Sequence, residues 1–340
     1  MGKDMEERSR DLLKKLQLVQ KRVDAELSRV RATKLYPPDL YDAAFHLILS
    51  GGKRVRPFLL LESAYLFGAN DAVSLPPAVG LELLHNFTLI HDDIMDQDSY
   101  RRGVATTYAK YGVPIAITAG DALFSYLFSH IVEGMSRAGA PAKLVTETIR
   151  VLSQASLRVC EGQAMDVMHS KYIADRSEYL KMIELKTASL FSAATEIGAT
   201  IGGASSSQSG DILRYGRDLG MMFQIVDDML GIHGDPEVTG KPVLSDLRRG
   251  KRTLILLHAL EKCSKGNRER IRAVLGNPSV TQEEVTAVAE ILVDLGSLDY
   301  ARKVADTYRE RALRSLSNLP ENEHRETLAS LVDSLFTRKK

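Results

Sequence analysis

Apolar residues in this chain recur at spacings of three and four, the periodicity of an amphipathic helix. The N-terminal segment shows the pattern between charges, at Met5, Leu12, Leu13, Leu16, Val19 and Val23. Similar segments follow over roughly 113–138, 141–170, 176–201, 209–231, 252–263, 266–275, 281–294, 297–317 and 321–338. We find no convincing run of alternating strand residues, so the chain is predicted to be all-α.

Prolines and glycines interrupt this helical pattern. The main breaks are at Pro37-Pro38, Gly51-Gly52, Gly68 to Asn70 and Pro76-Pro77. An apolar run from Phe58 to Phe67 lies between two of them, and Pro76-Pro77 suits the start of a helix that reaches about Asp98. Segments 205–207 and 234–250 are predicted loops. No linker is long or biased enough to separate domains, so residues 1–340 are predicted to form one domain of ten or more helices, with an N-terminal helix over 1–30.

The balance of charges excludes some classes of function. The chain has 45 lysines and arginines against 44 aspartates and glutamates, a formal net charge of +1. Such a chain offers no global field for nucleic acid or an anionic membrane. Its two cysteines allow one bridge at most, so no disulfide framework is predicted. The N-terminus lacks an apolar leader and no apolar run reaches about 18 residues. We therefore expect a cytoplasmic protein without a membrane span or a nucleic-acid partner.

A first acidic cluster reads His91-Asp92-Asp93-Ile94-Met95-Asp96. Asp92 and Asp96 are four residues apart, so on a helix they share one face, about 6 Å apart along the axis. Carboxylates so placed repel each other unless a cation or a basic partner lies between them. Oxygen ligands at this separation suit magnesium, which also recruits substrate phosphates. A solvated acidic helix end is the alternative, and Arg101-Arg102 could equally pair with these aspartates.

A second acidic cluster lies within an apolar helix. Gln224, Asp227 and Asp228 are spaced i, i+3 and i+4, whereas most of their neighbours between Met221 and Leu230 are apolar. Charges embedded in an apolar helix are costly unless they are paired or bound to a metal. The cluster therefore indicates a metal site, with a buried salt bridge as the alternative.

Three basic segments accompany the acidic clusters. Lys241 and Lys251 lie in glycine-bounded loops that suit a lid over phosphate, although each loop could be an ordinary surface turn. The segment Gly51-Gly52-Lys53-Arg54-Val55-Arg56-Pro57 lacks the first spaced glycine and the Ser or Thr of a nucleotide P-loop. Its glycine pair and three cations could still hold a diphosphate.

In this order, the motifs resemble those of the trans-isoprenyl diphosphate synthase family, and within it the archaeal-type geranylgeranyl diphosphate synthases. The resemblance covers roughly residues 30–335 and is carried by Gly51 to Pro57, His85 to Arg102, Lys186-Thr187, Phe223 to Asp228, and Gly240 to Thr253. It implies an isoprenoid synthase fold, a single helical bundle around a central catalytic cavity, usually as a homodimer. The first motif is complete as D-D-x-x-D. In the second, Gly231 stands where a third aspartate is often found, which leaves Asp228 and Asp235 as possible contributors through water.

The resemblance also implies an activity, the condensation of isopentenyl diphosphate with allylic diphosphates after magnesium-assisted ionisation. Several magnesium ions would be bound by Asp92, Asp96 and Asp227. Isopentenyl diphosphate would be bound by Lys53, Arg56, His85 and Arg102. The allylic diphosphate would be bound by Arg101, Lys186, Thr187, Gln224, Lys241 and Lys251. The residues implied to take part in catalysis are Asp92, Asp93, Asp96, Arg101, Lys186, Gln224, Asp227 and Asp228.

Product length is predicted from the residues before the first aspartate. One stripe of an ideal helix holds Leu81, His85, Thr88, Asp92 and Asp96. A tail that grows from the magnesium end would pass the small side chain of Thr88, whereas Phe87 points towards the flank. In the family that the chain resembles, an aromatic residue five positions before the first aspartate accompanies C20 products. Geranylgeranyl diphosphate is therefore the predicted product, and farnesyl or farnesylgeranyl diphosphate is the alternative.

Two other functions fit parts of the pattern. A non-catalytic partner subunit of a prenyl synthase would show the loss of an aspartate or a basic anchor, and here only Gly231 is atypical. A terpene cyclase would not need an isopentenyl diphosphate site, so Lys53, Arg56 and His85 argue against it.

Overall fold

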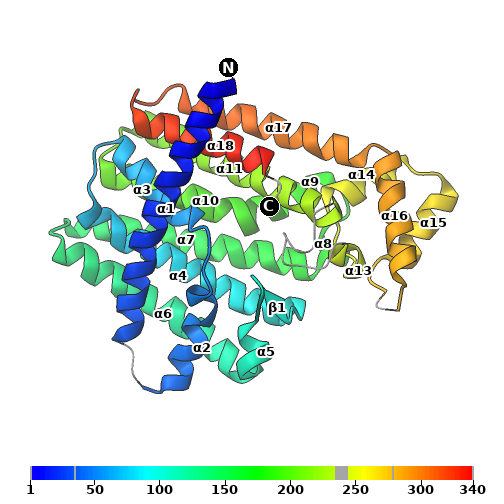
Figure 1. Ribbon diagram of the computed structural model, residues 1–340, viewed down its shortest axis with the longest axis horizontal. Coiled ribbons are helices and arrows are strands. Elements are labelled where there is room, and N and C mark those ends of the chain that lie inside the picture. The colour runs from blue at the N-terminus through cyan, green and yellow to red at the C-terminus, as the bar shows by residue number, and fades with distance from the viewer. Residues whose placement is uncertain (1, 34–35, 234–243, 278, 339–340) are drawn as a thin grey trace. The chain divides into compact units, whose positions relative to one another are not determined.

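The computed structural model describes residues 2–33, 36–233, 244–277 and 279–338, and helices dominate it (Figure 1). Lys241 and Asp235 lie outside the described residues. The all-α prediction is confirmed, because the described strands form a single hairpin of two residues each. The helices before the hairpin are α1 (Gly2–Ala32), α2 (Pro38–Leu49), α3 (Val55–Leu66) and α4 (Asp71–Asp96). Those after it are α5 (Thr107–Tyr111), α6 (Val113–Arg137), α7 (Ala142–Val167), α8 (His169–Tyr172), α9 (Arg176–Ile183), the π-helix η1 (Glu184–Ala188), α10 (Ser189–Gly202), α11 (Ser206–His233), α13 (Ser245–Arg248), α14 (Leu254–Lys262), α15 (Lys265–Val274), α16 (Gln282–Asp294), α17 (Ser297–Leu316) and α18 (Glu323–Thr337).

The chain forms two compact units, and it passes from one to the other within long helices such as α7 and α11. Unit 1 comprises Met1–Ser156, Leu190–Gly216 and Ser315–Leu331. Unit 2 comprises Leu157–Ser189, Arg217–Arg314 and Val332–Lys340. A single domain over 1–340 stays a prediction.

Helices α4 and α6 pack closely against each other at the centre of unit 1. Glycines make this possible, because a Cβ at Gly134 would lie 2.6 Å from Pro76 and one at Gly80 would lie 2.5 Å from Ile131. Pro76-Pro77 was predicted to start a helix, but α4 starts earlier, at Asp71. Its N-cap is Asn70, whose side chain accepts a hydrogen bond from a backbone amide of the first turn. The prolines therefore lie inside the helix, and Pro76 packs against α6.

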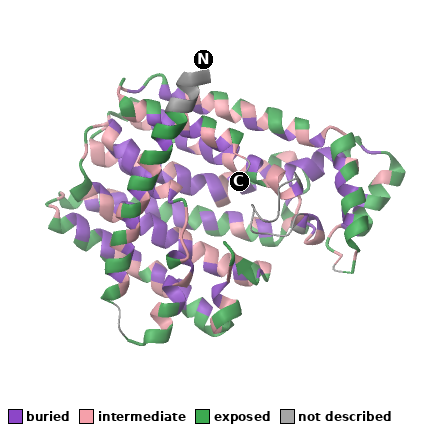
Figure 2. Ribbon diagram, viewed as in Figure 1, coloured by how far each residue is buried: buried purple, intermediate pink, exposed green. Residues whose placement is uncertain are grey.

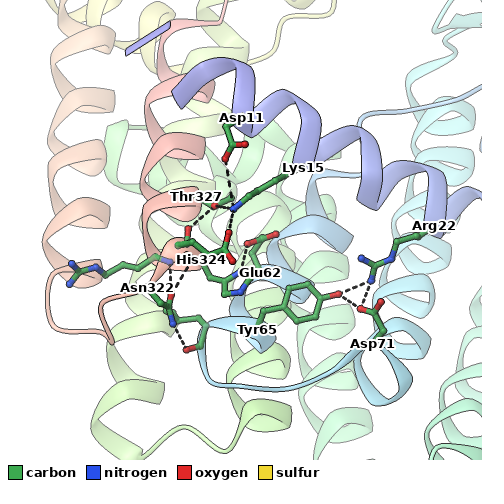
Figure 3. Close-up of polar contacts among 12 residues, drawn as sticks. Asp11, Lys15, Arg22, Glu62, Tyr65, Asp71, Asn322, His324 and Thr327 are labelled. Atoms are coloured by element: carbon green, nitrogen blue, oxygen red, sulfur yellow. Dashed lines mark hydrogen bonds and ion pairs between the residues drawn. The ribbon is translucent and has the colours of Figure 1, made fainter. Parts of the chain in front are cut away.

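The long helix α1 is held against α3 and α18 of unit 1 by its buried apolar residues and by polar side-chain contacts (Figure 3). Lys15 donates to Glu323 at 2.8 Å and to Thr327 at 2.9 Å. Arg22 contacts both Tyr65 and Asp71. These partners are far apart in sequence, so they fix the position of the N-terminal helix that the apolar spacing predicts.

Three features of unit 1 were absent from the sequence prediction. Two are the helices α2, between the predicted breaks at Pro37-Pro38 and Gly51-Gly52, and α5, before the predicted range 113–138. The third is the hairpin of β1 (Tyr100–Arg101) and β2 (Val104–Ala105), which is too short to show an alternating pattern. Its two turn residues, Arg102 and Gly103, have φ angles of 52° and 77°, as in a two-residue hairpin turn.

Unit 2 departs from the prediction at two places. Residues 176–201 were predicted as one helix, but the five-residue π-helix η1 separates α9 from α10. Residues 234–250 were predicted as loop, yet α13 occupies part of this range. The inward faces of α14 and α16 are buried, whereas α15 is mostly exposed (Figure 2).

One described helix, α6, has the length and apolar character of a membrane span. A core helix of a globular protein passes the same test, and α6 packs against α4. Both cysteines are free thiols, exposed at Cys160 and buried at Cys263.

Candidate active site

The glycine-rich segment between α2 and α3 is anchored by Arg54. Its side chain is buried and donates to Asp24 at 2.8 Å, to Glu82 at 2.7 Å and to the carbonyl of Ile48 at 2.7 Å. Of the three cations predicted to hold a diphosphate, Arg54 is therefore committed to the fold. Lys53 is exposed beside it.

Arg56 and His85, two residues predicted to bind isopentenyl diphosphate, are in contact. Arg56 Nη1 lies 3.1 Å from His85 Nε2. Burial and the nearby guanidinium groups, that of Arg56 foremost, hold the pKa of His85 well below its usual value. The imidazole is therefore neutral and can accept the hydrogen bond from Arg56. Arg56 also lies over the ring of Phe191, 5.0 Å from its centroid.

The hairpin turn brings Arg102 to the same segment. Arg102 donates to the carbonyl of Gly51. A Cβ at Gly52 would lie 2.9 Å from the Arg102 guanidinium and 3.0 Å from that of Arg54, so a side chain at residue 52 would push against both. Burial lowers the pKa of Arg102, which adjoins other arginines. Arg56 and Arg102 both lie near His85, since both add to the effect of burial in lowering its pKa, and together they offer guanidinium groups that match an oxyanion such as a diphosphate.

The first aspartate cluster occupies the C-terminal end of α4. A helix C-terminus carries partial negative charge and disfavours carboxylates, and the last turn of α4 contains no basic residue. Asp93 is fully buried and pairs with Arg101 at 2.7 Å. Burial raises its pKa to about 6 even though Arg101 favours the charged form. Asp92 and Asp96 are half-buried. The three aspartates therefore differ in a way that the sequence did not predict: Asp93 is buried against Arg101, whereas Asp92 and Asp96 are partly exposed.

The residues predicted to control product length lie in the same helix. Phe87 is half-buried, with its ring centroid 4.7 Å from that of His91 and 5.0 Å from that of Phe124 on α6. Phe124 in turn packs edge-on against Phe128 at 5.3 Å. Thr88 donates from its hydroxyl to a backbone carbonyl one turn earlier. An aromatic row on α6 therefore supports Phe87, and the sequence pattern did not predict that row.

In unit 2, the π-helix η1 carries Lys186 and Thr187. Lys186 Nζ lies 2.5 Å from Asp166 of α7, and Lys251 Nζ lies 3.5 Å from the same carboxylate oxygen. The structure thus brings together two lysines predicted to bind the allylic diphosphate. Asp166 was missed in the sequence. The signal that could have indicated it is Gly162, a glycine inside an otherwise regular helix, which often marks a close approach.

Gly162 lets α7 touch the backbone of η1. A Cβ at Gly162 would lie 2.3 Å from the backbone nitrogen of Lys186 and 2.7 Å from its Cα. A π-helical turn often marks a functional site. Here it occurs where two lysine-bearing segments meet one carboxylate.

A chain of hydrogen bonds joins η1 to the second aspartate cluster. The Thr187 hydroxyl donates to Gln224 Oε1 at 2.7 Å, and Gln224 Nε2 donates to Asp228 at 2.8 Å. The Tyr179 hydroxyl also donates to Asp228, at 2.6 Å. Burial, together with Asp246, raises the pKa of Asp228 to about 7. Asp228 therefore acts here as the acceptor that orients Gln224.

Asp227 has a different environment from Asp228. Its side chain is 56% exposed and pairs with Arg338 at 2.9 Å. At the atypical position of the motif, a Cβ at Gly231 would lie 3.3 Å from the carboxylate of Asp246. An aspartate at residue 231 would crowd Asp246, a residue that the sequence pattern did not indicate.

In each unit by itself, the ligands suit a hard divalent cation, since Asp92 and Asp96 in unit 1 and Asp227 in unit 2 offer carboxylate oxygens. No three histidine, cysteine or acidic side chains within the described ranges lie together as a ready-made metal site. Each cluster by itself thus leaves coordination positions that water or substrate oxygens would fill.

Comparison with known proteins gives a consistent result. A family model described as polyprenyl synthetase matches residues 37–292. The geranylgeranyl diphosphate synthase of Sulfolobus acidocaldarius is 41% identical over 283 residues, which cover 83% of this chain and 85% of that protein. The geranylfarnesyl diphosphate synthase of Aeropyrum pernix is 42% identical over 313 residues, which cover 89% of this chain and 96% of that protein.

Solved structures of related proteins have the same fold. The geranylgeranyl pyrophosphate synthetase of Pyrococcus horikoshii Ot3 superimposes with a TM-score of 0.87 at 36% identity, covering 96% of this chain and 98% of that one. A polyprenyl synthase of Caulobacter crescentus CB15, complexed with calcium and isoprenyl diphosphate, has a TM-score of 0.87 at 31% identity and covers 96% of this chain and 98% of that one.

Proposed function

Because the chain belongs to the polyprenyl synthetase family, we propose that it is a short-chain trans-prenyltransferase that condenses isopentenyl diphosphate with allylic diphosphates. The observation that carries the proposal is the position of Arg56 and Arg102 near His85, with Arg102 also donating to the carbonyl of Gly51. This is the group that binds isopentenyl diphosphate in the proposal, together with Lys53. Such a site distinguishes a condensing enzyme from a terpene cyclase.

Ionisation of the allylic diphosphate needs its negative charge to be neutralised. Lys186 and Lys251, which share Asp166, supply two cations, and Arg101, oriented by Asp93, supplies a third. Lys241 has the same proposed role. In the proposal, Asp92, Asp96 and Asp227 would hold magnesium ions, which would supply Lewis-acid neutralisation of the diphosphate charge. The similarity to the Caulobacter crescentus polyprenyl synthase, which was crystallised with calcium and isoprenyl diphosphate, supports this assignment.

The described hydrogen bonds give Gln224 a defined orientation. Thr187 donates to its carbonyl oxygen, and Asp228 accepts from its amide nitrogen. Gln224 and Thr187 are therefore held in place before substrate binds. Preorganised dipoles of this kind stabilise developing charge without reorganisation during the reaction.

We assign geranylgeranyl diphosphate, the C20 compound, as the product. The assignment rests on Phe87, with Thr88 beside it, and on the C20 relatives. Phe124 supports Phe87 from α6. Because one relative of similar identity is a geranylfarnesyl diphosphate synthase, a C25 product is the second candidate. We also propose a single-domain homodimer that acts in the cytoplasm.

The product assay is direct. The protein is incubated with labelled isopentenyl diphosphate, magnesium and each allylic starter in turn, and the hydrolysed products are separated by chromatography. Elongation to a C20 alcohol is expected. Recovery of only the C15 alcohol would overturn the product assignment, and the absence of elongation with every starter would overturn the proposed activity.

A further inference from the structure

Arg338 directly follows α18 and contacts α11 at three points, all within unit 2. Its Nη2 lies 2.9 Å from Asp227 Oδ1 and 3.1 Å from the carbonyl oxygen of Phe223. Its guanidinium carbon lies 4.0 Å from the centroid of the Phe223 ring, which is within the range of a cation–π contact. The Arg338 side chain is only 12% exposed. The Arg338 side chain is therefore held in a defined position by Asp227 and Phe223.

The carboxylate that Arg338 contacts is the one proposed to bind magnesium. A guanidinium and a divalent cation neutralise the same negative charge, so both favour the same carboxylate and their binding there is competitive. Burial of a cation is costly, and the side chain of Arg338 is mostly buried. Arg338 Nε is also buried without a hydrogen-bond partner among the described residues. The contact of Arg338 with Asp227 therefore has a specific geometry, but the burial of the guanidinium costs free energy. Such a contact suits a cation that another cation can displace.

We propose that Arg338 is an internal counter-cation for Asp227, which holds this carboxylate in the metal-free protein and leaves it when a divalent cation binds. The inference rests on the proposed role of Asp227 as a metal ligand. Arg338 is thus a positioning residue that sets the metal concentration at which the site fills.

The size of the effect follows from the competition. A ligand that binds only the open state has its apparent affinity reduced by the fraction of molecules that are open. If the Arg338 contact closes the site in most molecules, its removal should tighten metal binding by roughly three- to ten-fold.

A neighbouring ion pair provides a matched control. Arg309 of α17 lies 2.8 Å from Asp333 of α18, contacts Asp306 and lies over the ring of Phe336. Like Arg338, it holds the last turns of α18 through a carboxylate or carbonyl and an aromatic ring, but no described contact joins it to Asp227. Arg309→Gln therefore weakens the anchoring of α18 without freeing Asp227.

The test is a titration of the full chain with Mn²⁺ in the absence of substrate, with free Mn²⁺ read by electron paramagnetic resonance. Arg338→Gln should lower the Kd for Mn²⁺ by roughly three- to ten-fold, and Phe223→Leu, which removes the ring under the guanidinium, should lower it less. Arg309→Gln should leave the Kd unchanged. In the wild type, Mn²⁺ should increase hydrogen exchange at residues 333–338. An unchanged or higher Kd in Arg338→Gln, or an equal effect of Arg309→Gln, would overturn the inference.

Asp227→Asn separates this inference from the proposed function. It should weaken Mn²⁺ binding whether or not Arg338 competes. If Asp227→Asn binds Mn²⁺ as the wild type does, the metal assignment itself is wrong, and the counter-cation role falls with it. If Asp227→Asn weakens binding and Arg338→Gln changes nothing, only the counter-cation role is wrong.

Discussion

Substitution of Gly162 by alanine should disturb the site without changing any residue that contacts substrate. The added Cβ would lie 2.3 Å from the backbone nitrogen of Lys186. This separation is about 1 Å shorter than the roughly 3.5 Å at which non-bonded atoms pack well. The obstacle is backbone, so no side-chain rotation can relieve the clash. Either α7 or η1 must move by about 1 Å.

Two magnitudes follow from that displacement. Overpacking of this kind costs about 1–3 kcal/mol of stability. A misplacement of about 1 Å in a catalytic group can lower the rate about 100-fold. Because Lys186 and Thr187 move with η1, their contacts to Asp166 and Gln224 should weaken. Binding and ionisation of the allylic substrate should therefore be impaired. We therefore expect Gly162→Ala to lower kcat by about 10- to 100-fold, with a smaller change in the KM for isopentenyl diphosphate.

The assay is steady-state turnover with each substrate varied in turn, combined with thermal unfolding. Gly266→Ala is the control, because a Cβ at Gly266 in α15 meets nothing within 4 Å. That substitution should leave kinetics unchanged and cost no stability, since alanine is the better helix former. Kinetics and a melting temperature like those of the wild type in Gly162→Ala would refute the reasoning.

Three further predictions concern unit 1. Arg54→Met should lower the free energy of unfolding by about 3–5 kcal/mol in urea denaturation, because Glu82 is left buried without its cation; a loss below about 1 kcal/mol would contradict the anchoring role. Phe124→Ala removes the ring that supports Phe87 and should lengthen part of the product, as seen by chromatography; an unchanged C20 product would show that Phe124 gives no such support. His130 is buried, and burial lowers its pKa, so the folded state binds fewer protons than the unfolded state and stability falls as the pH drops below about 6.5. His130→Gln should make the unfolding free energy fall less between about pH 6.5 and 5 than it does in the wild type, and equal slopes would refute this.

The sequence pattern predicted most helices because their apolar spacing reflects a buried face. α6 was predicted over 113–138 and spans Val113–Arg137, and α16 was predicted over 281–294 and spans Gln282–Asp294. Features that depend on tertiary contact were missed. The π-helix η1 interrupts a segment whose apolar pattern is continuous, and only its contact with Gly162 on another helix marks the place.

The candidate site shows the same limit. The spacing of the first cluster identified the three aspartates, but it could not show that Asp93 is buried against Arg101 while Asp92 and Asp96 stay accessible. Likewise, Arg54 and Arg56 are two residues apart and carry the same charge, so the sequence alone does not distinguish their roles. Only the fold places a carboxylate beside Arg54 and a neutral histidine beside Arg56. Residues of the same type therefore have different roles here because they differ in burial and in hydrogen-bond partners.

The most direct test of the account is elongation by the wild type, Asp92→Ala and Asp227→Ala under identical conditions, with labelled isopentenyl diphosphate, an allylic starter and magnesium. We predict a C20 product from the wild type. Both variants should lose turnover by orders of magnitude while keeping the wild-type circular dichroism spectrum. Near-normal turnover in both variants, or no elongation by the wild type with any starter, would contradict the account.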